Sequence, residues 1–260
     1  MNTKFKHLWA IVLLLILQAC SQTSEYGKRP LNLEGFDFDL DLNTFFKDES
    51  LFDGSNEAGF SVYSEDVKVE ENDIMPGYIR YATYSMSQSR PLAEYAGVQF
   101  EKLDLYSDWN DESVLMLAAS SDYKSGDEIM KIIQELKSEF GAEPELQRGG
   151  FTNNNILYLV YEMEDKQIQF GMVLSDLDFI PWPETSSRRN NVWGDLAEPE
   201  PEPEKILLTT EIENNLEQLL KDSEENQCFL FITKPTMAEL MSKQTGRSGT
   251  LVYYWQRDNN

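Results

Sequence analysis

The spacing of hydrophobic residues predicts one well-defined helix near the middle of the chain. Ser125 is followed three residues later by Glu128, the spacing of a capping box, in which each side chain binds the backbone amide of the other residue. Apolar residues then recur every three or four positions as far as Phe140, which places them on one helical face. Gly141 and Pro144 are typical helix-ending residues. The stretch therefore predicts an amphipathic helix packed on a core.

Apolar runs on both sides of this helix predict strands. The continuous run at residues 114–118 is typical of a central strand that is covered on both faces. Residues 156–162 and 167–174, separated by a polar turn at 164–166, predict an antiparallel hairpin. This order of elements favours an α+β fold, with a mixed or mostly antiparallel sheet and helices packed on one face. Further candidate strands are residues 59–62, 78–85 and 98–105.

Residues 35–42 show strict alternation of apolar and acidic residues. This pattern predicts an amphipathic strand that carries Asp37, Asp39 and Asp41 on its solvated face. Carboxylates at every second position also resemble a calcium-binding loop, because hard cations prefer several oxygen ligands. Leu42 occupies the position where such a loop needs its turn glycine. The strand is therefore the favoured interpretation, and calcium binding is a weak alternative.

The second half of the chain contains a proline-rich break. Residues 198–204 read E-P-E-P-E-P-E, which predicts an extended polyproline II segment of about 22 Å. We therefore expect an α+β domain over residues 31–195, a Glu-Pro spacer over 196–205 and a small α/β unit over 206–260. That unit should hold a helix capped at Thr210, strands at 228–233 and 250–255, and a short helix from Pro235. With only about 55 residues it is expected to pack on the main domain.

Charge narrows the classes of ligand. The 260 residues include 46 acidic and 22 basic residues, for a formal net charge of −24 and a pI near 4.3. Such a negative surface repels phosphates, so nucleic-acid binding is not expected. Hydrophobic residues still make up 41% of the chain, which is enough for a folded core.

The first twenty residues have the pattern of an export signal. Lys4 and Lys6 precede about ten apolar residues, too few to span a membrane but typical of a signal-peptide core. The run ends in Leu17-Gln18-Ala19-Cys20. This sequence resembles the lipobox of bacterial lipoproteins, which implies cleavage after residue 19 and acyl chains on Cys20. By the same resemblance, Ser21 in place of aspartate favours the outer membrane.

Cleavage would remove two lysines and no acid, so the formal net charge of the mature chain becomes −26. Residues 20–30 are polar and aperiodic and predict an acylated tether. Since a charge of −26 disfavours contact with an anionic leaflet, the body is expected to stand off from the lipid.

Cleavage would also remove His7, the only histidine. A mature chain without histidine excludes Ser-His-Asp and Cys-His catalysis and histidine-ligated metals, and no cofactor is expected. Cys228 lies in an apolar run and predicts a buried, structural thiol. Ser121-Asp122-Tyr123-Lys124 matches the S-x-x-K motif of penicillin-binding serine hydrolases. Its companion motifs are missing and its residues are expected in a loop, so the match does not indicate catalysis.

A turn-rich stretch after residue 177 contains Trp182, Arg188, Arg189 and Trp193. Aromatic residues beside arginine are typical of interfaces, although tryptophan rings also commonly cover a core. The sequence thus predicts a non-enzymatic, outer-membrane lipoprotein whose acidic body binds an envelope protein through this loop. Binding of a glycan or peptide is the alternative, and a carboxylate-based hydrolase is a third, weaker one.

Overall fold

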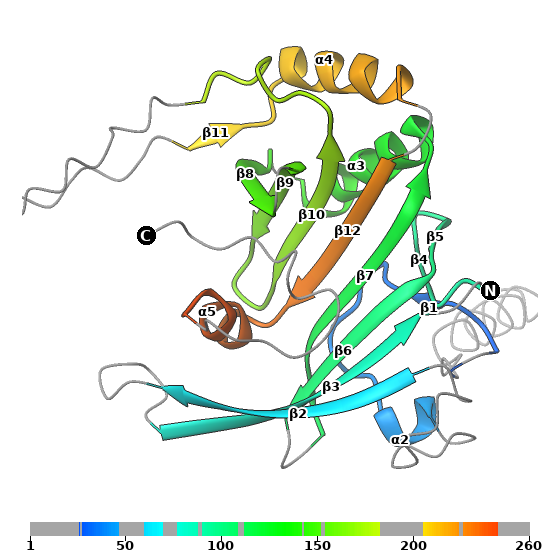
Figure 1. Cartoon of the computed structure of the whole chain (residues 1–260), viewed down its shortest axis with the longest axis vertical. Helices are drawn as coiled ribbons and strands as arrows, with labels where there is room; N and C mark the ends of the chain where they lie inside the picture. Colours follow the sequence, from blue (N-terminus) through cyan, green and yellow to red (C-terminus); the bar gives the residue numbers. More distant parts are fainter. Residues whose placement is uncertain are drawn as a thin grey trace, which may run out of the picture.

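The computed structural model describes residues 26, 28–46, 60–69, 77–87, 90–108, 112–141, 143–151, 154–182, 205–223 and 226–243. Figure 1 labels its elements. The strands are β1 (Leu31–Asn32), β2 (Phe60–Val69), β3 (Gly77–Ser87), β4 (Ala93–Tyr95), β5 (Val98–Phe100), β6 (Lys102–Asp108), β7 (Val114–Lys124), β8 (Glu145–Phe151), β9 (Asn154–Glu162), β10 (Gln167–Leu174), β11 (Ile206–Leu207) and β12 (Asn226–Thr233). The helices are α2 (Leu42–Phe45), α3 (Gly126–Phe140), α4 (Thr210–Lys221) and α5 (Pro235–Lys243).

Nine of the described strands form one sheet, in the order β11-β8-β9-β10-β12-β7-β6-β3-β2. Every neighbouring pair in this sheet is antiparallel. Strands β1, β4 and β5 form a smaller three-stranded sheet, in which β1 is parallel to β4. The predicted α+β class with a mostly antiparallel sheet is confirmed.

Strand β12 comes from the end of the chain but lies between β10 and β7 (Figure 1). Its side chains alternate between two hydrophobic clusters: Cys228, Leu230 and Ile232 belong to the larger cluster. Phe229 and Phe231 belong to the smaller cluster on the opposite face. Neighbouring β7 alternates in the same way, so the prediction of a central strand covered on both faces is confirmed. The segment after residue 205 therefore contributes a strand to the middle of the sheet.

The larger cluster lies between the sheet and the helices α3 and α4. The predicted capping box is present, because the Ser125 side chain accepts from the Glu128 amide and the Glu128 carboxylate accepts from the Ser125 amide. Gly141 ends the helix in a left-handed conformation with φ of 62°. Burial follows the predicted stripe along α3: Ile129, Ile132, Ile133 and Leu136 are fully buried. In α4 the cap is Thr209, one residue before the predicted position.

The start of α3 packs directly against the end of α4. A Cβ atom at Gly126 would lie 2.5 Å from the Leu220 carbonyl oxygen, so only glycine allows this approach. Near the other end of the helix pair, the Lys137 ammonium lies 2.5 Å from the Glu213 carboxylate. The two longer helices thus pack on one face, as predicted. The short α5 lies on the other face, where Met237 and Met241 are buried in the smaller cluster.

The strand predicted at residues 35–42 is wrong. The chain leaves β1 after Asn32, runs without strand pairing and enters α2 at Leu42. Phe38 has a φ of 69°, outside the extended region. The alternation still appears in burial, because Phe36 is buried while Asp37, Asp39 and Asp41 are exposed. The alternation of apolar and acidic residues thus predicted correctly which side chains face the core. It did not predict whether the segment pairs with another strand.

The predicted tether is partly folded onto the body. Tyr26 is buried, its amide donates to the Phe45 carbonyl at 2.8 Å, and its ring packs against Phe45 and Phe46. Leu31 then enters the small sheet beside Ala93. Tyr26 and Leu31, which lie within or beside the predicted tether, are therefore part of the fold. Within the described residues, no helix combines the length and apolarity needed to cross a bilayer.

The other predicted elements agree with the structure in kind. The hairpin is β9 and β10, and the predicted C-terminal strand and short helix are β12 and α5. The single strand predicted at 98–105 is divided into β5 and β6 at Glu101. Strand β8, with two glycines, was not predicted. The strand predicted at residues 250–255 lies outside the described residues.

Candidate binding surfaces

The structure describes one residue of the predicted contact loop. Trp182 is half-buried, packs against the larger cluster and donates its indole Nε1–H to the Leu177 carbonyl at 3.0 Å. Its ring therefore closes the edge of the core. Arg188, Arg189 and Trp193 lie outside the described residues, as does Cys20.

A groove lies where the described chain stops after Trp182 and resumes at Lys205. We call it the β11 groove: a cavity of about 580 Å³ lined by Phe179, Pro181, Lys205, Ile206, Leu207, Thr209, Glu211 and Ile212. Leu207 is 42% exposed and is one of two large hydrophobic residues exposed in the described part of the chain. Its backbone pairs with Glu145 in β8. Apolar groups flanked by charges make this groove suited to another protein.

Charges at the β11 groove are organised around Lys205. Its ammonium lies 2.7 Å from the Glu145 carboxylate and 3.7 Å from that of Glu162. This contact joins the residue before the edge strand β11 to the neighbouring strands β8 and β9. Since the lysine side chain is 60% exposed, the pair contributes little to stability and chiefly sets the charge pattern at the rim. Glu211 adds a further acid to the lining.

A second pocket lies at the opposite end of α4. We call it the Tyr123 pocket: a cavity of about 380 Å³ lined by Asp122, Tyr123, Val173, Leu174, Ser175, Leu219, Ser223, Asn226 and Gln227. Tyr123 is 69% exposed. Asp122 is held from two sides, by the Lys102 ammonium at 2.6 Å and the Gln227 amide at 2.8 Å. An exposed ring beside fixed polar groups is suited to a polar ligand with an apolar face.

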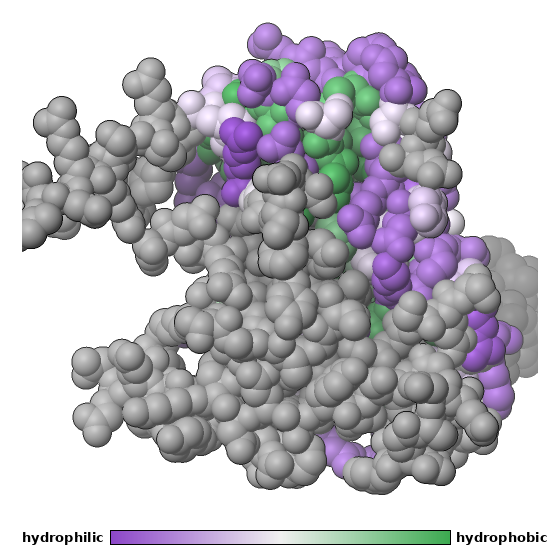
Figure 2. Space-filling view, in the orientation of Figure 1, coloured by the Kyte–Doolittle hydropathy of each residue, from purple (hydrophilic) through white to green (hydrophobic). Residues whose placement is uncertain are grey.

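Apolar surface is visible beneath α4 in the space-filling view, while the outer side of that helix is strongly hydrophilic (Figure 2). The α4 region thus combines an acidic exterior with apolar surface beside it.

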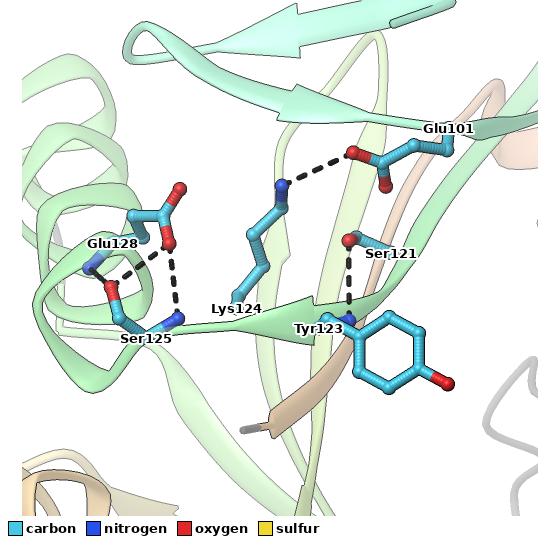
Figure 3. A network of polar contacts seen from close by, with 6 residues as sticks. All are labelled: Glu101, Ser121, Tyr123, Lys124, Ser125 and Glu128. Carbon is cyan, nitrogen blue, oxygen red and sulfur yellow. Dashed lines mark hydrogen bonds and ion pairs between the residues drawn. The ribbon is translucent and has the colours of Figure 1, made fainter. Parts of the chain in front are cut away.

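The residues of the S-x-x-K match lie on the last part of β7, not in the predicted loop. The Lys124 ammonium contacts the Glu101 carboxylate at 3.3 Å, and the Ser121 hydroxyl accepts from the Tyr123 amide (Figure 3). Tyr123 points away from Lys124 in the same view. Lys124 is only 8% exposed at its side chain, so it is a buried partner of Glu101. In the hydrolases the lysine instead activates the serine.

The three aspartates of the calcium alternative do not gather around one point. Asp41 caps α2, accepting from the Thr44 amide at 3.1 Å and from its hydroxyl at 3.0 Å. The bond from the Thr44 amide lowers the pKa of Asp41. The bond between Asp39 and Asp37, together with the Asp37 charge, raises the pKa of Asp39. In the described ranges no three acidic, histidine or cysteine side chains are placed to share a metal ion.

Cys228 is buried and unpaired, as predicted. Burial raises the pKa of its thiol to about 12, although the nearby Lys124 charge acts in the opposite direction. A thiol that stays protonated is a poor nucleophile and a poor metal ligand. Cys228 therefore serves as a small hydrophobic residue in the core.

Sequence reasoning missed the residues that form both surfaces. Tyr123 was read only as part of a short motif, and Leu207 was not singled out. A signal did exist for Leu207, because it is the middle residue of a three-residue apolar run between Lys205 and the helix cap at Thr209. No sequence signal brings Asp122 and Gln227 together, since they are separated by 105 positions.

Comparison of the chain with protein-family models, with curated proteins and with solved structures gave no match.

Proposed function

We propose that this chain is a non-enzymatic lipoprotein, anchored in the outer membrane through acyl chains on Cys20, whose acidic body binds a protein partner of the cell envelope. The lipobox-like sequence Leu17-Gln18-Ala19-Cys20 after the apolar run carries the proposal. Several acyl chains give stable attachment, because each buried CH₂ contributes about 0.8 kcal/mol. The proposal needs no cofactor and no nucleic acid.

The β11 groove supports the second half of the proposal. It presents the exposed Leu207 among the apolar residues Phe179, Pro181 and Ile206, with charges at its rim. In Figure 1, β11 and β1, the first strand of the described chain, lie on opposite sides of the molecule. A body anchored at its N-terminus would therefore present this groove away from the anchor. The surplus of acids favours a partner whose contact surface is basic.

The anchoring half is tested by fractionating cells that express the chain with Cys20→Ala. The unchanged chain should be found with the outer membrane, and the mass of its N-terminal peptide should show an acylated cysteine. Cys20→Ala should abolish the acyl mass and move the processed body to the soluble fraction. An unacylated wild type in the soluble fraction would contradict the proposal.

The binding half is tested by affinity capture from detergent-solubilised membranes. Leu207→Asp places a charge in the β11 groove, and Tyr123→Asp is the matched control because it changes the other exposed large hydrophobic side chain. We expect the wild type and Tyr123→Asp each to capture one envelope protein in stoichiometric amount. Leu207→Asp should capture at least tenfold less of this protein. Equal thermal unfolding temperatures would show that both variants are folded. If all three proteins captured the same amount of partner, the β11 groove would not be the binding surface.

Glycan binding stays the second candidate, favoured by the Tyr123 pocket alone. Its exposed ring would stack on a sugar face while Asp122, held between Lys102 and Gln227, accepts hydroxyl hydrogen bonds. In the capture experiment, a ligand that is lost with Tyr123→Asp and kept with Leu207→Asp would favour this candidate over the protein partner.

A further inference from the structure

The two edges of the nine-stranded sheet differ in length. At one edge, β11 has only two residues. At the other edge, β2 has ten residues and pairs with β3 along its whole length (Figure 1). No strand of the described chain pairs with the outer side of β2. Proteins usually shorten, bend or interrupt such an edge, because its backbone groups can bind another strand. The β2 strand contains no proline and its register has no bulge, so it lacks these devices.

The direction of the outer backbone groups of β2 follows from the ladders. Alternate residues of an antiparallel strand direct both their N–H and C=O groups to the same neighbouring strand. The Lys234 amide donates to the Leu115 carbonyl at 2.9 Å, which continues the β12–β7 ladder. The Met163 amide and the Lys166 carbonyl continue the β9–β10 ladder in the same way and give the same alternation. Followed through β6 and β3, the register directs the odd-numbered residues of β2 toward β3. The outward backbone groups of β2 therefore belong to Phe60, Val62, Ser64, Asp66 and Lys68.

These outward groups are arranged symmetrically about Ser64. A second copy of β2 can pair with them in the antiparallel direction about a two-fold axis at this residue, perpendicular to the sheet. Phe60 then lies opposite Lys68 of the second copy, and Val62 lies opposite Asp66. Each outward residue exchanges two hydrogen bonds with the residue opposite it, so this register forms about ten. Moving the axis by one residue in either direction leaves about eight.

The charges along β2 agree with the same register. About Ser64, no acidic position lies directly opposite another, because Glu65 is opposite Tyr63 and Asp66 is opposite Val62. Moving the axis one residue toward the C-terminal end of β2 would place Glu65 opposite Glu65, and one more residue would place Asp66 opposite Asp66. Like charges directly opposite each other in a ladder are destabilising. The register with the most hydrogen bonds is thus free of directly opposed acids.

We infer that two copies of this chain join into one continuous sheet through antiparallel pairing of their β2 strands, with the two-fold axis at Ser64. The β11 groove lies at the other end of the strand order, so the pairing does not cover it. The pairing requires no acyl chain on Cys20 and no envelope partner. It is therefore independent of the proposed function, and either can fail without the other.

The test is disulfide formation between copies in cells that express the full chain. Ser64→Cys places two thiols at the axis, where the Cα atoms of a hydrogen-bonded pair are about 5.5 Å apart and a disulfide can form. Ser61→Cys is the matched control, because it makes the same change in the same strand but leaves its copies about 20 Å apart. Under a mild oxidant, we expect the linked dimer to form at least tenfold faster with Ser64→Cys. Wild type measures any background from Cys20, and Cys228 is buried.

A proline at residue 66 tests whether the backbone makes the contact. Added to Ser64→Cys, Asp66→Pro removes an outward N–H group, whereas Asp66→Ala removes the same carboxylate and keeps the N–H group. We expect at least tenfold slower linkage with the proline and an unchanged rate with the alanine. Equal unfolding temperatures of the reduced proteins would show that both are folded.

Three outcomes would overturn the inference. The first is equal linkage at residues 64 and 61, which decides the question even if the proline variant does not fold. The second is equal linkage in folded Asp66→Pro and Asp66→Ala. The third is a disulfide between residue 64 and a different protein, which would assign the β2 edge to another partner.

Discussion

The buried thiol of Cys228 couples stability to alkaline pH. Its pKa is raised to about 12 by burial, against 9.0 for an ordinary thiol. Above pH 9 the unfolded chain releases this proton while the folded chain retains it, so the folded state is increasingly disfavoured until pH 12. Between pH 7.5 and 9.5 the free energy of unfolding should fall more in wild type than in Cys228→Ala, by an amount on the order of 1 kcal/mol.

Urea unfolding of the two proteins at both pH values measures this difference. The cavity left by Cys228→Ala lowers the free energy of unfolding by the same amount at each pH. It therefore cancels when the change between the two pH values is compared. Tyr95 and Tyr161 also have raised pKa values through burial, and their contribution is common to both proteins. Identical pH dependence in the two proteins would show that the thiol ionises in the folded state.

At the residue scale, the features predicted from sequence are those that depend on near neighbours. Ser125 and Glu128 cap α3 because both partners lie within one turn. The burial of Cys228 could be predicted because the four residues that follow it are apolar. The roles of Asp41 and Lys124 were missed, since one depends on where α2 begins and the other on Glu101, 23 positions away. A single residue in sequence does not reveal a partner on another strand.

At the scale of elements, β12 makes the C-terminal segment indispensable. It forms ladders with both β10 and β7, so a chain ending at residue 195, the predicted domain boundary, would lack the strand between them. We expect that shortened chain to show no cooperative thermal unfolding and to bind a hydrophobic dye. A full-length chain cut at a protease site placed in the Glu-Pro segment should stay associated and should unfold cooperatively. A shortened chain that folds would contradict the central role of β12.

The sequence predicted the elements better than their order. The apolar stripe of α3 and the β9–β10 hairpin depend on contacts between residues close in the chain. Such contacts can be predicted from the periodic spacing of apolar residues. The position of β12 between β7 and β10 depends on pairing with strands that are distant in the sequence. An apolar strand could occupy several positions in a sheet, so its sequence does not predict which one. Strand β8 was hidden because Gly149 and Gly150 weaken the strand pattern.

At the scale of the whole molecule, the surplus of acids should make stability depend on salt. Ion pairs of the described residues include Lys102–Asp122, Lys124–Glu101, Lys137–Glu213, Lys205 with both Glu145 and Glu162, and Lys221–Glu217. With 46 acids against 22 bases, the acidic side chains outnumber the basic ones by 24. Salt screens attraction and repulsion alike, and here repulsion predominates because the net charge is far from zero.

The unfolding temperature at pH 7 should therefore rise by about 5 °C between 10 mM and 1 M NaCl, as the screening length falls from about 30 Å to about 3 Å. Differential scanning calorimetry measures the rise. Near pH 4.3, the pI of the chain, self-repulsion vanishes and the same salt step should change the unfolding temperature little. A fall at pH 7 would mean that attraction within the ion pairs outweighs the repulsion among the surplus acids, because salt would then remove more stabilisation than destabilisation.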